Sequence, residues 1–447
     1  MTGSDTIFAL SSGVGRVAIA VMRLSGPQSS LLLKDLAGSL PAPRHFSLCS
    51  LRDPGSGELL DKAAVVWCPG PQSVTGEDVV ELHLHGSPAV LGAVFDVLRR
   101  YPLLRPADAG EFTRRAFANG KLDLVEVEGL ADLLEARTSS QLRQAMQQFS
   151  GVASSVFDGW RSELLQIRAG IEAAVDFSDE RGVAEAALES VGQQIQALEQ
   201  KMQLSIDQSA VSEILRDGVR VVLAGYPNTG KSSILNLLAR RDAAIVATRP
   251  GTTRDVIEVH MDLGGVPVIL TDTAGLRLVT SDEIEAEGIR RTRRRIADAN
   301  IVLWVSAPDV PGSAHPEAGI KVDLYVRNKS DLVDPGSKLF RNETEPPYLD
   351  VSAQTGSGSS ELINYIRSLA NEQVRAGDAA LIVSARQKSI VERSIRLLND
   401  ACMVGSTNLE LKAECIRLAS DEVGRLTGRV DVEEWLGAIF NRFCIGK

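Results

Sequence analysis

Short runs of apolar and β-branched residues dominate the first part of the chain. Three of these runs have the composition of strands: residues 17–24, 63–67 and 79–84. Helical spacing of apolar residues then occupies 88–100 and 108–118, and Asn119-Gly120 is a typical stop for the second helix. The pattern predicts a mixed α/β domain over residues 1–120.

A helical pattern replaces these runs after residue 124. Residues 124–215 carry few prolines and many Gln, Glu, Ala and Leu. Within them, 188–215 predicts one long helix that ends at Gly218. The helical pattern returns near the C-terminus in three segments: 386–398, 409–426 and 432–440.

The simplest interpretation is one helical domain that an inserted domain divides. Its two parts would be residues 121–215 and 376–447, and the insert would be 216–375. Insertion costs little because the two ends of an inserted domain commonly lie close together.

The insert opens with the sequence GYPNTGKS at 225–232, between an apolar strand at 219–224 and an apolar helix at 234–238. This is the context of a Walker A loop, whose backbone N–H groups surround phosphate oxygens. Lys231 can reach the β- and γ-phosphates, and the Ser232 hydroxyl can bind Mg²⁺. The nucleotide-binding residues expected from this loop are Asn228, Thr229, Gly230, Lys231, Ser232 and Ser233.

A second phosphate-binding segment follows the predicted strand 266–270. The Asp272 carboxylate suits a Mg²⁺-linked water, and the Gly275 N–H suits a γ-phosphate. Thr253 lies between the two segments, in Gly251-Thr-Thr-Arg-Asp255, and would complete the Mg²⁺ coordination. The expected nucleotide contacts here are Thr252, Thr253, Asp272, Thr273, Ala274 and Gly275.

Base recognition is predicted at the end of the strand 322–326. The Asp331 carboxylate can accept hydrogen bonds from guanine N1–H and the 2-amino group, which adenine lacks. The remaining base contacts expected are Asn328, Lys329, Ser352 and Ala353, the last two after the strand 348–351. Ordinary strand ends with turn residues are the alternative. Because the elements occur in the right order, we interpret the insert as a GTPase domain.

Catalysis in this GTPase domain needs an unusual group. Many GTPases orient the attacking water with a glutamine where this chain has Leu276. Glu283, Glu285 and Glu287 follow, and any of them could position a water. Alternatively, they are acids favoured at the start of a helix by its dipole.

Composition agrees with a multidomain globular protein. A length of 447 residues corresponds to about three domains, and 44% hydrophobic with 24% charged residues is ordinary for such a protein. We find no membrane-spanning apolar run and no signal peptide, so we expect a cytoplasmic protein without a membrane partner. The net charge of −10 does not favour general nucleic-acid binding, so any RNA contact should be local.

Five cysteines without CxxC spacing predict a reduced protein that has no structural disulfide or zinc site. His83 and His85 alternate on one strand face and are interpreted as structural. Cys444 is the fourth residue from the end, on a tail expected to be mobile. Its thiol could be a nucleophile or could line a pocket. Gly446-Lys447 fits a prenylation box badly.

Two segments outside the GTPase motifs are highly specific: EFTRRAFANGKLDL at 111–124 and the terminal CIGK at 444–447. With VMRLSG at 21–26 and the motifs GYPNTGKS, GTTRD, DTAGLR and NKSD, they make the chain similar to the MnmE (TrmE) family of tRNA-modification GTPases. The resemblance covers the whole chain. It implies a multidomain α/β plus all-α fold: an N-terminal α/β folate-binding-like domain, a split helical domain and an inserted P-loop (Ras-like) GTPase domain.

The resemblance also implies a reaction. The family installs an aminomethyl or carboxymethylaminomethyl group at C5 of the wobble uridine of certain tRNAs. It acts as a homodimer, in a heterotetramer with the FAD-dependent partner MnmG (GidA), and uses a tetrahydrofolate one-carbon donor. By position, Arg23, Glu81 and Lys121 match the folate-contacting residues, and Lys447 would close that site. Ordinary surface ion pairs are the alternative for the first three.

Three further assignments rest on the resemblance. Asn228 matches a K⁺-binding asparagine, and the loop 247–252 would supply further ligands. Glu285 matches the water-positioning acid, and Cys444 the family's terminal cysteine, so the expected catalytic residues are Glu285, Lys231 and Cys444. The expected K⁺ site comprises Asn228, Ala247, Arg249 and Thr252. Ala247 and Arg249 depart from the usual family residues, so the strength of K⁺ stimulation stays open. A regulatory GTPase switch of the ribosome-assembly type remains the alternative function.

Overall fold

The structure is a computed structural model of the 447-residue chain. It describes residues 5–13, 17–176, 181–240, 244–245, 258–273, 293–316, 319–333, 347–374, 381–404, 408–430 and 433–446. The chain forms two compact units, which are described separately. The first contains residues 1–131, 148–165 and 420–447, and the second contains 132–147 and 166–419.

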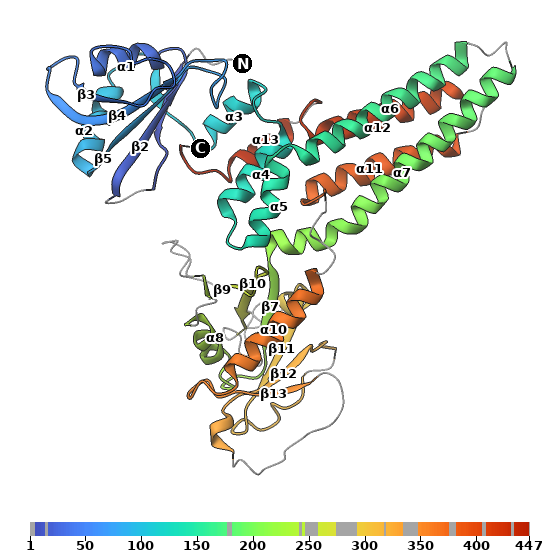
Figure 1. The fold of residues 1–447 in the computed structure, drawn as a ribbon. Coiled ribbons are helices and arrows are strands. Elements are labelled where there is room, and N and C mark those ends of the chain that lie inside the picture. The colour runs from blue at the N-terminus through green and yellow to red at the C-terminus, as the bar shows by residue number, and fades with distance from the viewer. Residues whose placement is uncertain are drawn as a thin grey trace, which may run out of the picture. The chain divides into compact units, whose positions relative to one another are not determined.

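A six-stranded sheet in the order β3-β4-β5-β2-β1-β6 forms the centre of the first unit (Figure 1, blue). Its strands are β1 (Thr6–Leu10), β2 (Val17–Ser25), β3 (Ser47–Arg52), β4 (Leu59–Cys68), β5 (Val79–Gly86) and β6 (Leu104–Pro106). β1 pairs with β6 in parallel, and the other neighbours are antiparallel.

The helices α1 (Ser29–Ala37) and α2 (Pro88–Leu98) cover one face of this sheet. Strand alternation sends Met22 and Leu24 of β2 into the core beneath these helices. The intervening Arg23 therefore points to the opposite face, where it lies across from Glu81 of β5.

A smaller core joins the N-terminal and C-terminal parts of the first unit. It includes Leu124 and Val127 of α4 (Leu124–Glu135), Phe440 of α13 (Glu433–Phe440), and Phe443 just beyond that helix. The helix α3 (Glu111–Ala118) precedes α4, and it ends immediately before Asn119-Gly120 as expected.

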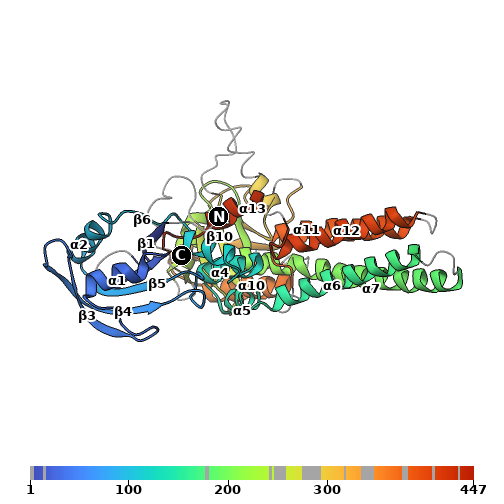
Figure 2. The same ribbon diagram turned by 90° about the horizontal axis from the view of Figure 1, so that it is seen from above.

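Long helices form much of the second unit. The longest is α7 (Arg181–Asp217), and α11 (Ala385–Met403) lies alongside it (Figure 2). Gly218 ends α7 with a left-handed φ of 91°, a conformation that glycine adopts without strain. The helices α5 (Ser139–Phe149), α6 (Val152–Asp176) and α12 (Leu409–Leu426) each contribute to both units, as does α4.

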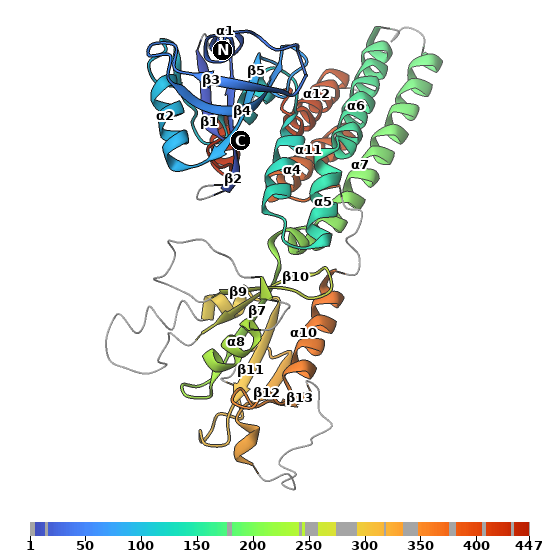
Figure 3. The same ribbon diagram turned by 60° about the vertical axis from the view of Figure 1, so that its left-hand side comes forward.

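A seven-stranded sheet in the order β13-β12-β11-β7-β10-β9-β8 completes the second unit (Figure 3). Its strands are β7 (Val219–Ala224), β8 (Ala244–Ile245), β9 (Glu258–Asp262), β10 (Pro267–Asp272), β11 (Ile301–Ser306), β12 (Leu324–Arg327) and β13 (Tyr348–Asp350). The first five strands in this order are parallel. β9 pairs antiparallel with β10, and β8 pairs antiparallel with β9. The helices α8 (Lys231–Ala239) and α10 (Ser359–Val374) pack on one face.

The expected fold class is confirmed: an α/β domain, helical segments and a second α/β domain with a mostly parallel sheet are all present. The domain boundaries at residues 120, 215 and 375 stay a prediction. Within the described parts of the chain, no helix is both long and apolar enough to cross a membrane.

Candidate functional site

The candidate nucleotide site lies where parallel strands of the second sheet end. β7, β11, β12 and β13 run in the same direction, so their carboxyl ends share one edge of the sheet. That edge carries the 225–232 loop after β7, residues 328–331 after β12 and Ser352-Ala353 after β13. Sequence reasoning placed all three segments in one site, and the structure brings them together.

Two glycines shape the loop after β7. Gly225 has a φ of 145°, and a Cβ there would lie 2.2 Å from the Val305 carbonyl oxygen. Gly230 has a φ of 87°, and a Cβ there would lie 2.2 Å from Asn328 Nδ2. A larger residue would clash with the backbone of β11 at position 225 and with the Asn328 side chain at position 230, and both positions have a left-handed φ, which explains why the loop needs glycine there.

Lys231 is the first residue of α8, and its side chain folds back over the loop. Its Nζ donates to the carbonyl oxygens of Gly225 and Tyr226, both at 2.8 Å. Burial lowers the pKa of Lys231, and the nearby Asp272 carboxylate opposes that effect. An ammonium group at a helix N-terminus favours binding of an anion such as phosphate.

Ser232 and Asp272 form a pair of oxygen donors beside Lys231. The Ser232 hydroxyl donates to Asp272 Oδ2 at 2.6 Å. A hydroxyl and a carboxylate at this spacing fit a Mg²⁺ ion, which prefers oxygen ligands. Thr273 follows Asp272, and its hydroxyl donates to the Leu223 carbonyl oxygen at 2.7 Å, which anchors this strand end to β7.

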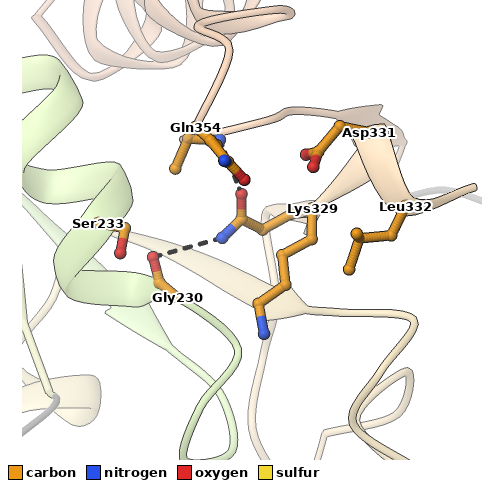
Figure 4. Close-up of a pocket in the computed structure, with 8 residues that line it drawn as sticks. Gly230, Ser233, Lys329, Asp331, Leu332 and Gln354 are labelled. Carbon is orange, nitrogen blue, oxygen red and sulfur yellow. Dashed lines mark hydrogen bonds between the residues drawn. The ribbon is translucent and has the colours of Figure 1, made fainter.

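A cavity of about 250 Å³ adjoins these groups (Figure 4). It is lined by Gly230, Ser233, Asn328, Lys329, Asp331, Leu332, Ala353 and Gln354. In the view of Figure 4, Gly230 and Ser233 lie on one side, and Asp331 and Leu332 lie on the other. Asp331, the residue predicted to read a guanine base, is thus part of the cavity wall.

Hydrogen bonds between the loops hold this cavity together. The amide of Asn328 donates to the Thr229 carbonyl oxygen at 2.9 Å and accepts from the Ala353 N–H at 3.1 Å. The Ser352 hydroxyl donates to the Asp331 carboxylate. Asn328 therefore links all three loops, and Ser352 orients the predicted base-reading group.

The C-terminal tail is held in place in the first unit, so the expectation of a mobile tail is wrong. Ile445 forms an antiparallel bridge with Ala109, and the Ser11 hydroxyl donates to the Gly446 carbonyl oxygen at 2.9 Å. Phe443 is buried on the other side of Cys444, whose own side chain is exposed. Sequence reasoning missed Ser11 and Ala109, because a contact between opposite ends of a chain leaves no local pattern.

Comparisons with known proteins extend over the whole chain. A family model for the MnmE helical domain matches residues 124–444, and one for the N-terminus of the GTP-binding protein TrmE matches residues 6–121. The tRNA modification GTPase MnmE of Methylobacterium sp. (strain 4-46) is 48% identical over 447 residues, which cover 99% of this chain and 100% of that protein. The chain belongs to the MnmE (TrmE) family.

Membership of the MnmE family confirms the resemblance and identifies the chain as a GTPase. A mitochondrial relative from Danio rerio, a 5-taurinomethyluridine-tRNA synthase subunit, is 42% identical and covers 100% of this chain and 94% of its own. Among solved structures, the G domain of the T. maritima FeoB iron transporter is 27% identical over 34% of this chain and 98% of its own, with a TM-score of 0.26. That score is too low to support an argument.

Two of the residues that MnmE resemblance assigns to folate lie together. Arg23 Nε and Nη2 both donate to Glu81 Oε1, at 2.9 Å and 2.7 Å. The second carboxylate oxygen, Oε2, lies 3.6 Å from His83 Nε2. Lys121 is exposed in the segment after α3, and its main-chain N–H donates to the Ala116 carbonyl oxygen. The ion pair is compatible with both interpretations of Arg23 and Glu81, as folate-contacting residues and as an ordinary surface ion pair.

One of the two histidines interpreted as structural, His85, is paired with a carboxylate. Asp61 Oδ1 lies 2.7 Å from its Nδ1, and Asp61 Oδ2 accepts its main-chain N–H at 2.8 Å. Across the described ranges, no group of three or more His, Cys, Asp or Glu residues could hold a metal ion.

Several residues expected in the GTPase machinery, from their own motifs or from the MnmE resemblance, lie outside the described residues. They are Ala247, Arg249, Thr252, Thr253, Ala274, Gly275 and Glu285, together with Lys447 of the folate assignment. Their roles stay predictions. Asn228 is described, and it adopts a left-handed φ of 65° within the Walker A loop.

Proposed function

We propose that this chain is the GTP-hydrolysing subunit of an enzyme that modifies tRNA. The modification is addition of an aminomethyl or carboxymethylaminomethyl group to C5 of the wobble uridine of certain tRNAs. This proposal rests on sequence similarity over the full length to proteins named tRNA modification GTPase. The similarity includes the N-terminal unit and the tail as well as the GTPase motifs. The name of the Danio rerio relative supports a uridine as the modified base.

The nucleotide site supplies charge and orientation. Lys231 can place its ammonium beside the β- and γ-phosphates once it leaves the loop carbonyls. Ser232 and Asp272 would hold a Mg²⁺ ion, which neutralises charge that develops on the phosphate oxygens. Asp331 would select guanine, and Glu285 would position the attacking water.

K⁺ would stimulate this hydrolysis when GTPase domains dimerise. Asn228, Ala247, Arg249 and Thr252 would provide its site, with main-chain carbonyls as ligands at the last three. GTP hydrolysis by the purified chain is expected to be faster in KCl than in NaCl at matched ionic strength. Equal rates in the two salts would remove K⁺ from the proposal.

A tetrahydrofolate derivative would bind on the face of the N-terminal sheet that carries Arg23 and Glu81, opposite α1 and α2. Arg23 and Lys121 can attract its carboxylates, Lys447 would close the site, and Glu81 can accept hydrogen bonds from the pterin edge. Glu81 fits this task because its side chain is a quarter exposed and Arg23 contacts only one of its two oxygens.

Folate binding separates the enzyme from the alternative of a regulatory ribosome-assembly switch, which has no use for a one-carbon donor. In calorimetric titration with 5-formyltetrahydrofolate, we expect binding to the full chain and at least about tenfold weaker binding to Glu81→Gln, which loses a charged acceptor. The control is Glu58→Gln, an exposed glutamate in the segment between β3 and β4 of the same unit. Failure of the unaltered chain to bind would favour the switch.

The remaining parts of the proposal concern the complete enzyme. A homodimer would associate with an FAD-dependent partner of the MnmG (GidA) type in the cytoplasm, and tRNA would be the substrate. Cys444 would act in the RNA chemistry, because its thiol is exposed between two anchored residues rather than buried. The thiol would serve either as a nucleophile at uridine C6 or as part of the architecture of the pocket.

A further inference from the structure

Two side chains from the end of β12 hold consecutive carbonyl groups of the Walker A loop. Lys329 Nζ donates to the Asn228 carbonyl oxygen at 2.9 Å, and Asn328 Nδ2 donates to the Thr229 carbonyl oxygen at 2.9 Å. In a trans peptide the C=O of one residue points opposite to the N–H of the next. The N–H groups of Thr229 and Gly230 therefore point away from β12.

Lys329 acts from an uncommon backbone conformation. Its φ is 58° and that of Asn228 is 65°, although neither residue is glycine. Left-handed non-glycine residues cost free energy and persist where surrounding contacts hold them. The contact between Lys329 Nζ and the Asn228 carbonyl joins these two residues, so any group that orients the ammonium also acts on the loop.

Asp309 is such a group. Its Oδ2 lies 2.5 Å from Lys329 Nζ, and its side chain is about half exposed. Asp309 belongs to a turn after β11 in which the Val310 N–H donates to the Ala307 carbonyl oxygen at 3.1 Å. This edge therefore carries a continuous path of contacts from the end of β11 through the end of β12 to the loop after β7.

The turn that carries Asp309 is anchored in the core. Ser313 is buried, and its hydroxyl accepts from the Ala307 N–H at 3.2 Å and lies 3.1 Å from the Ala307 carbonyl oxygen. The indole N–H of Trp304 donates to the Ser313 carbonyl oxygen at 2.9 Å. A carboxylate on a fixed turn loses little freedom when it binds the ammonium, so the pair is preorganised.

We infer that Asp309 is a positioning residue for nucleotide binding. Through Lys329 it holds the Asn228–Thr229 peptide in the orientation that presents the Thr229 N–H to a phosphate of the nucleotide. Asp309 itself does not touch the nucleotide. The inference rests on the proposed function only in that the Walker A loop binds a guanine nucleotide.

The test is fluorescent GDP binding to the full chain in a double-mutant cycle. Asp309→Asn keeps the size of the side chain but removes its charge, and we expect about threefold to fivefold weaker binding. In a Lys329→Met background, the same substitution should change the affinity by less than about 1.5-fold, because the ammonium through which it acts is gone. Asp309→Glu should restore most of the affinity.

Asp350→Asn provides a matched control. Asp350 pairs with Arg327 of β12 at 2.5 Å and has a similar exposure to Asp309, but it lies at the neighbouring strand β13 rather than beside the loop. Its loss should leave GDP affinity within about 1.5-fold of the unaltered chain. A circular dichroism melt of each variant checks that the fold is retained.

Two results would overturn the inference. One is an Asp309→Asn variant with unaltered GDP affinity. The other is an equal loss of affinity from Asp309→Asn whether Lys329 is present or has been replaced by methionine. Failure of the unaltered chain to bind GDP would instead contradict the proposed function. Because GDP binding requires neither tRNA nor folate, the inference can fail while the proposed function survives.

Discussion

At the scale of single residues, a buried ion-pair cluster in the first unit should contribute more to the free energy of unfolding than exposed charges do. Glu111 is buried at the start of α3, where Arg105 donates to both of its carboxylate oxygens and Arg115 to one. The Asp108 N–H adds a further hydrogen bond at 2.9 Å. Removing the charge of this buried carboxylate should lower the free energy of unfolding strongly, because the two guanidinium groups would remain without it.

Glu111→Gln is therefore expected to lower the free energy of unfolding by about 3 kcal/mol at pH 7. Burial alone would raise the pKa of Glu111, but Arg105, the Asp108 N–H and Arg115 outweigh it and hold the pKa below its ordinary value of 4.5. Stability from this group is thus present above about pH 4.5 and is lost as pH falls through the lowered pKa.

Urea unfolding of the unaltered chain and of Glu111→Gln, at pH 7 and in steps below pH 4.5, measures their difference in free energy of unfolding. This difference should become smaller as pH falls. Glu414→Gln is the control, because Glu414 pairs with Arg417 on an exposed helix surface and should matter little. A gap that is absent at pH 7, or that widens in acid, would contradict the role given to Glu111.

At the scale of elements, the tail depends on one close approach. Gly446 has a φ of 97°, and a Cβ there would lie 2.3 Å from the Leu10 carbonyl oxygen. Gly446→Ala is therefore expected to destabilise the docked tail by about 1–3 kcal/mol, from backbone strain and the clash together.

Hydrogen–deuterium exchange of the C-terminal peptide reports this change, and the Gly446→Ala protein should exchange faster there. Gly437→Ala serves as the control, because a Cβ at Gly437 in α13 meets no atom within 4 Å. Alanine also favours a helix. If the two variants exchanged alike, the tail would not depend on the approach of Gly446 to Leu10.

Elements with a strong local signal were predictable from the sequence. The strand expected at 219–224 coincides with β7, and Gly218 ends the preceding helix as its position indicates. α7 begins at Arg181, before the expected start at residue 188. The prediction missed its first turns because they lack clear helical spacing of apolar residues. β11 was not predicted, although all six of its residues are buried. A fully buried strand has no alternation to separate it from a buried helix.

Contacts between distant segments were harder to predict than the segments themselves. The Walker A loop and the base-reading loop follow from local motifs, but the role of Asp309 does not, because it depends on which strand ends are neighbours. Likewise, Arg23 and Glu81 become a pair only through the register of β2 with β5. The docking of Gly446 against Leu10 joins opposite ends of the chain, and no local sequence pattern encodes it.

At the scale of the whole molecule, the nucleotide site and the residues proposed for folate and RNA chemistry belong to different units. Lys231, Asp272 and Asp331 lie in the second unit, whereas Arg23, Glu81 and Cys444 lie in the first. Loss of either unit's chemistry should abolish modification, even when the other unit still binds its own ligand.

The central claim is that this chain modifies tRNA, and nucleoside mass spectrometry of tRNA from a strain that lacks the gene tests it most directly. We predict that C5-aminomethyl-type uridines disappear from this tRNA. They should return with the intact gene but not with Cys444→Ser, although that variant should still hydrolyse GTP. An unchanged nucleoside profile in the strain without the gene would contradict the claim and would favour the regulatory switch.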